Sequence, residues 1–202
     1  MKRIALLALV LAFCALSFAP TGALAVDTNV ALGKSVTATG PYNGDLTTLV
    51  DGIFRPQWTT WYDGTVYWSG TGVTINVDLG STFTIRSFVV QADDNDAYTL
   101  FYRDLTDNSF KVAWNVPNYD VYGGVNFTGM QTRPDPYHDT QRYILASPIV
   151  TDALQFVAAS GDNSYAVSEI QAYGSAVPLP ASMLLFAPGL AGLAAIKRRF
   201  KK

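Results

Sequence analysis

Few side chains in this sequence of 202 residues could perform catalysis. The chain has one histidine, His138, in the segment PDPYHDT, and one glutamate, Glu169. Its only cysteine, Cys14, lies in an apolar run near the N-terminus. A Ser/His/Asp triad would need His138, which stands between prolines and turn-forming residues, as expected of a surface loop. The sequence therefore predicts a non-catalytic protein.

Three aspartates crowd one short segment, as Asp93, Asp94 and Asp96 in ADDNDAY. Calcium is a hard cation that takes 6 to 8 oxygen ligands, so such a loop is a candidate metal site. The spacing does not fit an EF-hand, because Ala97 and Tyr98 stand where an oxygen ligand and glycine are needed. A tight polar turn between strands and a carboxylate pair for glycoside hydrolysis are the alternatives.

Aromatic residues gather in the segment FRPQWTTWYDGTVYW, residues 54–68. Flat rings on a loop can stack on sugar rings, with polar neighbours bonding the hydroxyls. Trp58 and Trp61 lie among Pro, Gln and Thr and are candidates for this role. Trp68 leads into an alternating segment and is expected in the core.

A second candidate binding region is residues 115–139, which show little periodicity. Long irregular segments inside a compact domain usually serve a function. We expect ligand contacts from Tyr119, Tyr122, Arg133 and Tyr137. The alternative is a crossover connection containing short strands.

The elements that must position these residues are strands. Residues 73–79 alternate apolar and polar side chains, and residues 83–91 alternate with a change of phase at Arg86 and Ser87 that indicates a bulge. Further strands are predicted at 97–103, 111–115, 142–145, 153–158 and 166–173. Short strands separated by turn residues predict an all-β sandwich or barrel.

Both ends of the chain are directed to membranes. Residues 1–25 have Lys2 and Arg3, an apolar run and a final Ala-Leu-Ala, which predict a signal peptide. Residues 175–202 hold an apolar helix at 181–196 followed by five basic residues, which should keep that end in the cytoplasm. Between them, residues 26–174 carry 7 basic and 16 acidic residues, which argues against nucleic acid as a partner.

Six motifs in residues 26–174 together resemble the discoidin, or coagulation-factor type C, family: NVALGKSVTATG, LVDG, INVDLGS, YTLFYRD, RYIL and SEIQAYG. The resemblance implies a galactose-binding-like jelly-roll β-sandwich with binding loops at one end, and ligands that include glycans, phospholipid or protein. It also implies a structural calcium near Asp51 and Glu169. Ile53 departs from the family there, because a polar ligand is common at that position.

The C-terminal segment resembles the PEP-CTERM sorting signal of Gram-negative bacteria, which the membrane enzyme exosortase processes. The motif is Val177-Pro178-Leu179-Pro180, in which Leu179 replaces the family's glutamate. The resemblance implies an exported protein that is anchored in the inner membrane by its tail and reaches the cell surface or the medium after processing.

Together these features predict a non-catalytic surface or extracellular-matrix protein that binds glycan or exopolysaccharide through loops of the sandwich. A structural surface protein without small-ligand binding is one alternative. A carbohydrate-active enzyme that uses the Asp-rich segment is the other.

Overall fold

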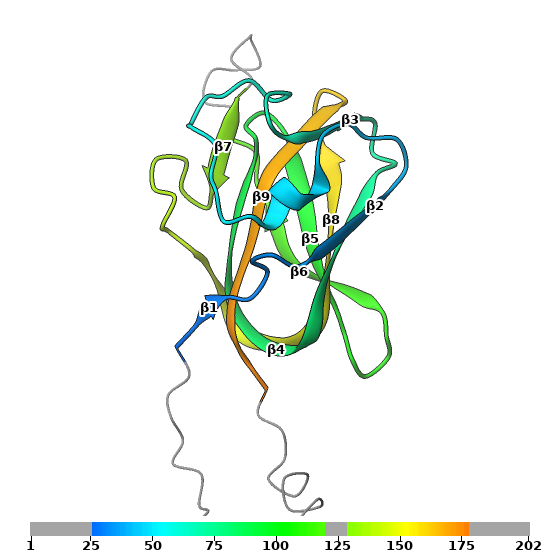
Figure 1. The fold of residues 1–202 in the computed structure, drawn as a ribbon, viewed down its shortest axis with the longest axis vertical. Helices are drawn as coiled ribbons and strands as arrows, with labels where there is room; N and C mark the ends of the chain where they lie inside the picture. The colour runs from blue at the N-terminus through cyan, green and yellow to red at the C-terminus, as the bar shows by residue number, and fades with distance from the viewer. Residues whose placement is uncertain (1–25, 120–128, 178–202) are drawn as a thin grey trace, which may run out of the picture.

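A computed structural model describes residues 26–119 and 129–177, which form a β-sandwich (Figure 1). Its strands are β1 (Thr28–Asn29), β2 (Ser35–Thr39), β3 (Val66–Ser69), β4 (Thr74–Asp93), β5 (Ala97–Arg103), β6 (Phe110–Val116), β7 (Met130–Arg133), β8 (Tyr143–Ser160) and β9 (Ser164–Ala176). The one helical element in this part of the chain is the 3-10 helix η1 (Leu46–Val50). The all-β prediction is confirmed for the described residues.

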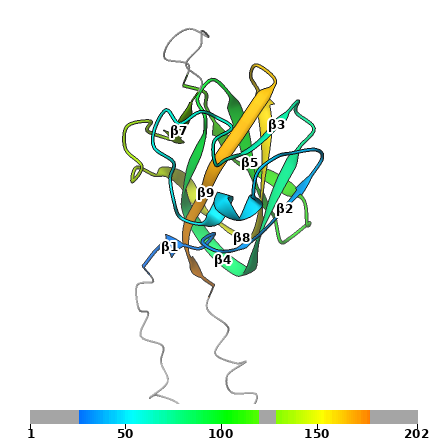
Figure 2. The same ribbon diagram turned by 45° about the horizontal axis from the view of Figure 1, so that its top comes forward.

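The long strands β4 and β8 take part in both layers of the sandwich. The first half of β4 pairs with β2 and β8, β8 pairs with β5, and β5 pairs with β6. The second half of β4 pairs with β9 and β7, and β9 also pairs with β1 and β3. All of these pairs are antiparallel. Figure 1 shows β4 curving through one end of the molecule, and in both views β9 passes in front of β5 of the other layer (Figure 2).

One bent strand, β4, replaces the two strands predicted at 73–79 and 83–91. Gly80 adopts a positive φ of 71° in this region. The register with β8 shifts between Asp78 and Phe83, so the chain changes layer without ending the strand. A second shift between Ile85 and Ser87 lies where the alternation changes phase, which confirms the predicted bulge.

Stacked aromatic rings form part of the core between the layers. The rings of Tyr98 and Phe156 are 4.9 Å apart and nearly parallel, and those of Trp68 and Tyr165 are 6.0 Å apart. All four side chains are buried. Offset stacking at such distances is the favoured geometry of aromatic pairs. The prediction that Trp68 belongs to the core is confirmed.

The two ends of the described domain lie side by side. β1 pairs with the end of β9, where Thr28 is opposite Gly174. The side chain of Asn29 strengthens this contact, because its Oδ1 accepts the N–H groups of Ala31 (3.2 Å) and Ala172 (3.3 Å). Figures 1 and 2 both show β1 and the end of β9 at one end of the sandwich and the β8–β9 turn at the other.

Several predicted segments lie outside the described residues. These are the signal peptide at 1–25, the apolar helix at 181–196 and Pro178, Leu179 and Pro180 of the sorting motif. Val177 is the last described residue, and its N–H donates to the Thr82 carbonyl at 3.2 Å. Within 26–119 and 129–177, no helix is long and apolar enough to cross a membrane.

Candidate functional site

The two loop regions predicted to bind ligand meet in the structure. The Trp58 N–H donates to the Met130 carbonyl at 3.0 Å, and the Met130 N–H donates to the Thr59 carbonyl at 2.8 Å. Thr60 and Gly129 form an isolated β-bridge beside them. A Cβ on Gly129 would lie 2.8 Å from the Trp58 Cα, so this close approach requires glycine. The aromatic loop (residues 57–62) is therefore fixed along β7.

Gln57 connects the aromatic loop to the Pro-rich loop (residues 134–142) that follows β7. Its Nε2 donates to Thr132 Oγ1 at 2.9 Å and to Asp139 Oδ1 at 2.7 Å. Thr132 Oγ1 also donates to Asp139 Oδ1 at 2.5 Å. Gln57 Oε1 is buried and has no hydrogen-bond partner among the described residues. The bases of the two loops are thus joined by one polar cluster.

Aromatic rings from both loops reach the surface. The exposed fraction is 44% for Trp58, 57% for Tyr62 and 70% for Tyr137. Trp61 is half-buried and makes edge-on contacts with Tyr62 (5.3 Å) and Tyr67 (5.2 Å). Trp58 has a φ of 68°, a conformation that costs energy in a bulky residue and that clusters at functional sites. Sequence reasoning missed Tyr62, although its position next to Trp61 in an aromatic-rich segment is a signal for it.

The Arg133 side chain lies in the interior and does not reach the surface. Its side chain is fully buried, and its guanidinium donates to the carbonyls of Pro117, Ala92, Gln131 and Asp93 at 2.6 to 3.1 Å. Arg133 was expected to contact ligand. In the structure it instead joins β4, β7 and the segment after β6.

Tyr119 lies with Arg133, because the guanidinium carbon is 5.4 Å from the centre of its ring. The Tyr119 hydroxyl donates to the Pro134 carbonyl, which ties the segment after β6 to the Pro-rich loop. Tyr122, the fourth residue expected from this region, lies outside the described residues. His138 is on the surface, as predicted, with Nδ1 2.8 Å from Asp135 Oδ2.

The three aspartates of the Asp-rich turn (residues 93–97) are buried. Asp93 Oδ1 accepts the Asp94 N–H at 3.0 Å, Asp94 Oδ1 accepts the Gly129 N–H at 3.2 Å, and Asp96 Oδ1 accepts the Asp162 N–H at 3.3 Å. Hydrogen bonds of this kind are expected of a tight polar turn, which was predicted from the sequence as the alternative to a calcium site. They join the β4–β5 turn to the β8–β9 turn and to β7.

The electrostatics of this turn favour neutral carboxyl groups. Burial raises the pKa of Asp93 to about 8, and the nearby carboxylates of Asp96 and Asp94 add to the shift. Burial, followed by repulsion from Asp162, raises the pKa of Asp96 to about 7. Burial also raises the pKa of Asp94.

Asp51 and Glu169 lie together, as the family resemblance implied. Glu169 is buried on β9, and its Oε1 accepts the Gly52 N–H at 3.1 Å and a hydrogen from Gln171 Nε2 at 3.0 Å. Its Oε2 is buried without a hydrogen-bond partner in the described residues. Burial raises the pKa of Glu169 to about 8, and repulsion from Asp51 adds to the shift.

Asp51 and Glu169 supply some of the oxygen ligands that a cation site needs. An unpartnered buried carboxylate oxygen beside a second carboxylate is a suitable start for a calcium site. The remaining oxygens would have to come from backbone carbonyls or water, since the described residues contain no group of three or more His, Cys, Asp or Glu side chains that could hold a metal ion.

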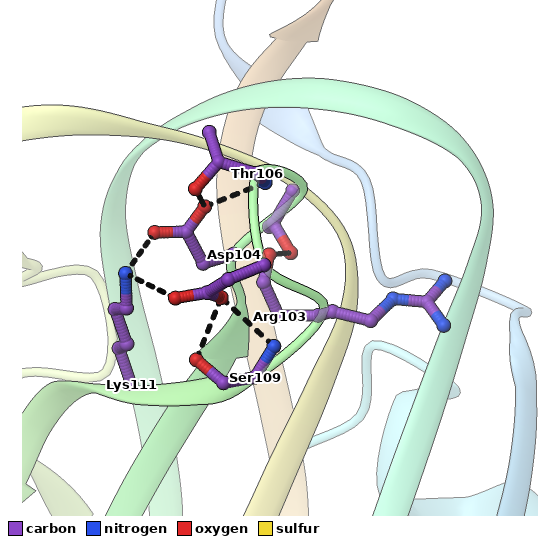
Figure 3. Close-up of polar contacts among 7 residues, drawn as sticks. Arg103, Asp104, Thr106, Ser109 and Lys111 are labelled. Atoms are coloured by element: carbon purple, nitrogen blue, oxygen red, sulfur yellow. Dashed lines mark hydrogen bonds and ion pairs between the residues drawn. The ribbon is translucent and has the colours of Figure 1, made fainter.

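The β5–β6 hairpin carries a separate charged cluster (Figure 3). Lys111 forms ion pairs with Asp104 and with Asp107 (3.1 Å). The two carboxylates also accept the N–H groups of Thr106 and Ser109 at 2.8 and 3.0 Å. Each pattern closes a turn through an aspartate side chain, so the cluster shapes the hairpin.

Comparisons with known proteins place the chain near carbohydrate-binding modules in structure only. No protein-family model matches the chain, and no curated protein matches it in sequence. Similar solved structures include the family 32 carbohydrate-binding module of Streptococcus pneumoniae EndoD, with a TM-score of 0.49 and 15% identity over 72% of this chain and 99% of that chain. The family 32 module of C. perfringens NanJ, solved in complex with galactose, has a TM-score of 0.48 and 12% identity over 74% and 99% of the two chains. A fucose-binding module of Streptococcus pneumoniae has a TM-score of 0.48 and 12% identity over 72% and 97%.

Proposed function

We propose that this chain is a non-catalytic, exported surface or matrix protein that binds a glycan, such as extracellular polysaccharide, through the aromatic loop and the Pro-rich loop. One observation carries the proposal: Trp58 and Tyr62 from the first loop and Tyr137 from the second are exposed on loops that share one polar cluster at their bases. Exposed rings held on a rigid base suit stacking on sugar rings.

The polar groups at the base of the loops complement this role. Asp139 is half-buried at the base of the Pro-rich loop. Its carboxylate is an acceptor for a sugar hydroxyl. Within the Asp-rich turn the carboxylates are buried and bonded to the backbone, which favours a binding role over the carbohydrate-active enzyme considered as an alternative.

The sequence of the two ends supports export. We propose that residues 1–25 are a signal peptide and that residues 175–202 hold the protein in the inner membrane until an exosortase-type enzyme processes it. We also propose that Asp51 and Glu169 hold a structural calcium ion.

A glycan array with the purified exported protein, run with and without calcium, tests the proposed function. We expect Trp58→Ala and Tyr62→Ala to weaken binding about five- to a hundredfold, equivalent to about 1 to 3 kcal/mol, without unfolding the protein. Phe110→Ala is the matched control, because Phe110 is an exposed ring on β6 that is not part of either loop.

A wild-type protein that binds no glycan under either condition contradicts the proposal and supports a structural surface protein. Release of sugar products from a polysaccharide by the wild type would support the enzyme alternative instead.

A further inference from the structure

The segment that leads into the aromatic loop, residues 52–57, belongs to no strand. Among the described residues, its backbone makes no hydrogen bond to the backbone of a strand. Side chains hold it to the sheet at three points instead. Glu169 accepts the Gly52 N–H, Gln91 bonds the backbone of Arg55, and Gln57 bonds Thr132 and Asp139.

The middle contact, from Gln91, is the most complete. Gln91 lies on β4 and is fully buried. Its Oε1 accepts the Arg55 N–H at 2.7 Å, and its Nε2 donates to the Arg55 carbonyl at 2.9 Å. The primary amide thus bonds Arg55 as the backbone of a neighbouring strand would, with one donor and one acceptor side by side.

The Gln91 amide is itself held from both sides. Ser168 Oγ donates to Gln91 Oε1 at 2.7 Å, and Gln91 Nε2 donates to Thr132 Oγ1 at 3.3 Å. The β4–β9 register shifts here, since Gln91 is opposite Glu169 and Ala92 is opposite Val167. Ser168 is therefore the extra residue of a bulge, and its hydroxyl reaches the amide of Gln91.

These contacts connect the sheet to the exposed rings in two steps. Arg55 is three residues before Trp58, and Thr132 bonds both Gln91 and Gln57 at the base of the aromatic loop. Residues 52–57 have no backbone ladder, so these side-chain bonds set how the chain enters the aromatic loop, while the backbone bonds of Trp58 and Thr59 to Met130 hold the loop beyond that point along β7. The Gln91 side chain is already held by bonds on both sides, so it loses little additional conformational entropy when it holds the loop. A loop ordered in this way before ligand binding is a pre-organised binding surface.

We propose that Gln91 is a positioning residue for the aromatic loop: it substitutes for a missing strand partner of Arg55 and so fixes the segment that precedes Trp58, whose own backbone is bonded to Met130, for ligand binding. Its effect on affinity rests on the proposed function, whereas its effect on the loop does not.

Gln91→Met tests this role, because methionine has a similar length and volume but lacks the amide donor and acceptor. Gln155→Met is the matched control. Gln155 lies on β8 in the other layer, where its Nε2 bonds Asn76 Oδ1 at 3.0 Å, and among the described residues no hydrogen bond of its side chain reaches the aromatic loop. Ser168→Ala is a milder second variant that leaves the Gln91 amide in place but removes its fixed donor.

Two readouts of the full-length protein separate positioning from folding. Deuterium exchange should become faster in residues 53–60 of Gln91→Met and remain as in the wild type in β5 and β8. Affinity for the neutral oligosaccharide that the wild type binds most tightly, from a panel terminated in galactose, glucose or N-acetylglucosamine, should fall about tenfold or more. Ser168→Ala should change both readouts in the same direction by less, and Gln155→Met should change neither.

The proposal is overturned if a folded Gln91→Met protein exchanges deuterium in residues 53–60 at the same rate as the wild type. It is also overturned if that variant binds the oligosaccharide with the same affinity as the wild type. If Gln91→Met does not fold, unchanged exchange in Ser168→Ala overturns it. If the wild type binds no member of the panel, the proposed function fails while the exchange measurement still decides the role of Gln91.

Discussion

At the scale of single residues, the acids of the Asp-rich turn are unusual because they are buried with raised pKa values. Tyr98 has one hydroxyl proton and two acceptors near it, the Ala166 carbonyl at 2.9 Å and Asp96 Oδ2 at 3.3 Å. The Tyr98 oxygen also accepts the Ala166 N–H at 3.1 Å. The hydrogen bond from Tyr98 lowers the pKa of Asp96, but burial and repulsion from Asp162 outweigh it and raise that pKa to about 7.

We predict that the protein is more stable near pH 5 than near pH 8. The folded-state pKa values of Asp93 and Asp96, about 8 and 7, lie above the ordinary aspartate pKa of 3.8. As pH rises above the unfolded value, the unfolded carboxyls lose protons before the folded ones do, so stability falls through this window. Thermal melts of Asp96→Asn should depend less on pH and should show a higher melting temperature than the wild type at pH 8.

Asp104 in the β5–β6 hairpin is the control with the opposite sign. Hydrogen bonds from Lys111 and Thr106 lower the pKa of Asp104, so its contribution to stability is present at neutral pH and lost in acid. Asp104→Asn should lower the melting temperature at pH 7, and the effect should shrink only as the pH falls below 3.8 toward the lowered pKa of Asp104. A wild-type melting temperature that rises from pH 5 to pH 8 contradicts the neutral state of the buried acids.

Calcium should raise the melting temperature if Asp51 and Glu169 hold it. A ligand that binds only the folded state stabilises it by about 2.7 kcal/mol at a concentration of 100 times its dissociation constant. Chelation should therefore lower the melting temperature of the wild type and leave Asp51→Ala unchanged. Asp94→Ala should keep the calcium response, and a melting curve indifferent to calcium in the wild type refutes the site.

The exposure of Trp58 was an expectation that the sequence supported, whereas the burial of Arg133 was not foreseen. Trp58 stands among turn-forming and polar residues, and local composition is a fair guide to exposure. Arg133 occupies a similar segment by composition, but its place was decided by carbonyls of β4 and of the segment after β6. Contacts between distant segments of the chain carry no signal in local sequence.

At the scale of secondary-structure elements, alternation of apolar and polar residues located the long strands but not how they join. The predicted segment 97–103 coincides with β5, and 142–145 and 153–158 are both parts of β8. Between the two parts, Pro148 suggests a break, yet the chain stays extended because it faces the bend of β4. The short strands β1, β2, β3 and β7 were missed, since two to five residues are too few to show a period.

Gly161 shows how tightly the β8–β9 turn packs against the Asp-rich turn. A Cβ there would lie 1.6 Å from Asp96 Oδ1 and 3.1 Å from a ring carbon of Tyr165. We predict that Gly161→Ala destabilises the protein by about 1 to 3 kcal/mol, the usual effect of an overfilled site. Chemical denaturation measures the change.

Gly72→Ala is the control for that substitution, because a Cβ on Gly72 would meet nothing within 4 Å. Its free energy of unfolding should stay within about 0.5 kcal/mol of the wild type. A Gly161→Ala variant as stable as Gly72→Ala would mean that the two turns do not pack as described.

At the scale of the whole molecule, charge restricts which glycans can bind. Residues 26–174 carry 7 basic and 16 acidic residues, a formal net charge of −9. Raised pKa values at Asp93, Asp96 and Glu169 reduce this charge near neutral pH but do not reverse it. Four of the basic residues are also occupied: Arg86, Arg103 and Lys111 by aspartates, and Arg133 by carbonyls. The domain as a whole therefore repels polyanions.

Salt dependence distinguishes the two classes of glycan. We predict that affinity for a neutral oligosaccharide changes less than about twofold between 50 and 500 mM NaCl, because stacking and hydrogen bonds to an uncharged ligand are not screened. An acidic polysaccharide should bind weakly at low salt and more tightly at high salt, as screening removes the repulsion. Isothermal titration at the two salt concentrations measures both.

The exposed Asp63, next to the aromatic loop, provides the local test of this argument. Asp63→Asn removes one negative charge near the exposed rings, so it should improve binding of an acidic polysaccharide at low salt and leave the neutral ligand unaffected. At 500 mM NaCl the Debye length is only about 4 Å, so the gain should largely disappear there. Tight binding of an acidic polymer by the wild type at low salt, in the presence of a chelator, would show that a local positive surface outweighs the net charge, and the preference for neutral glycans would be wrong.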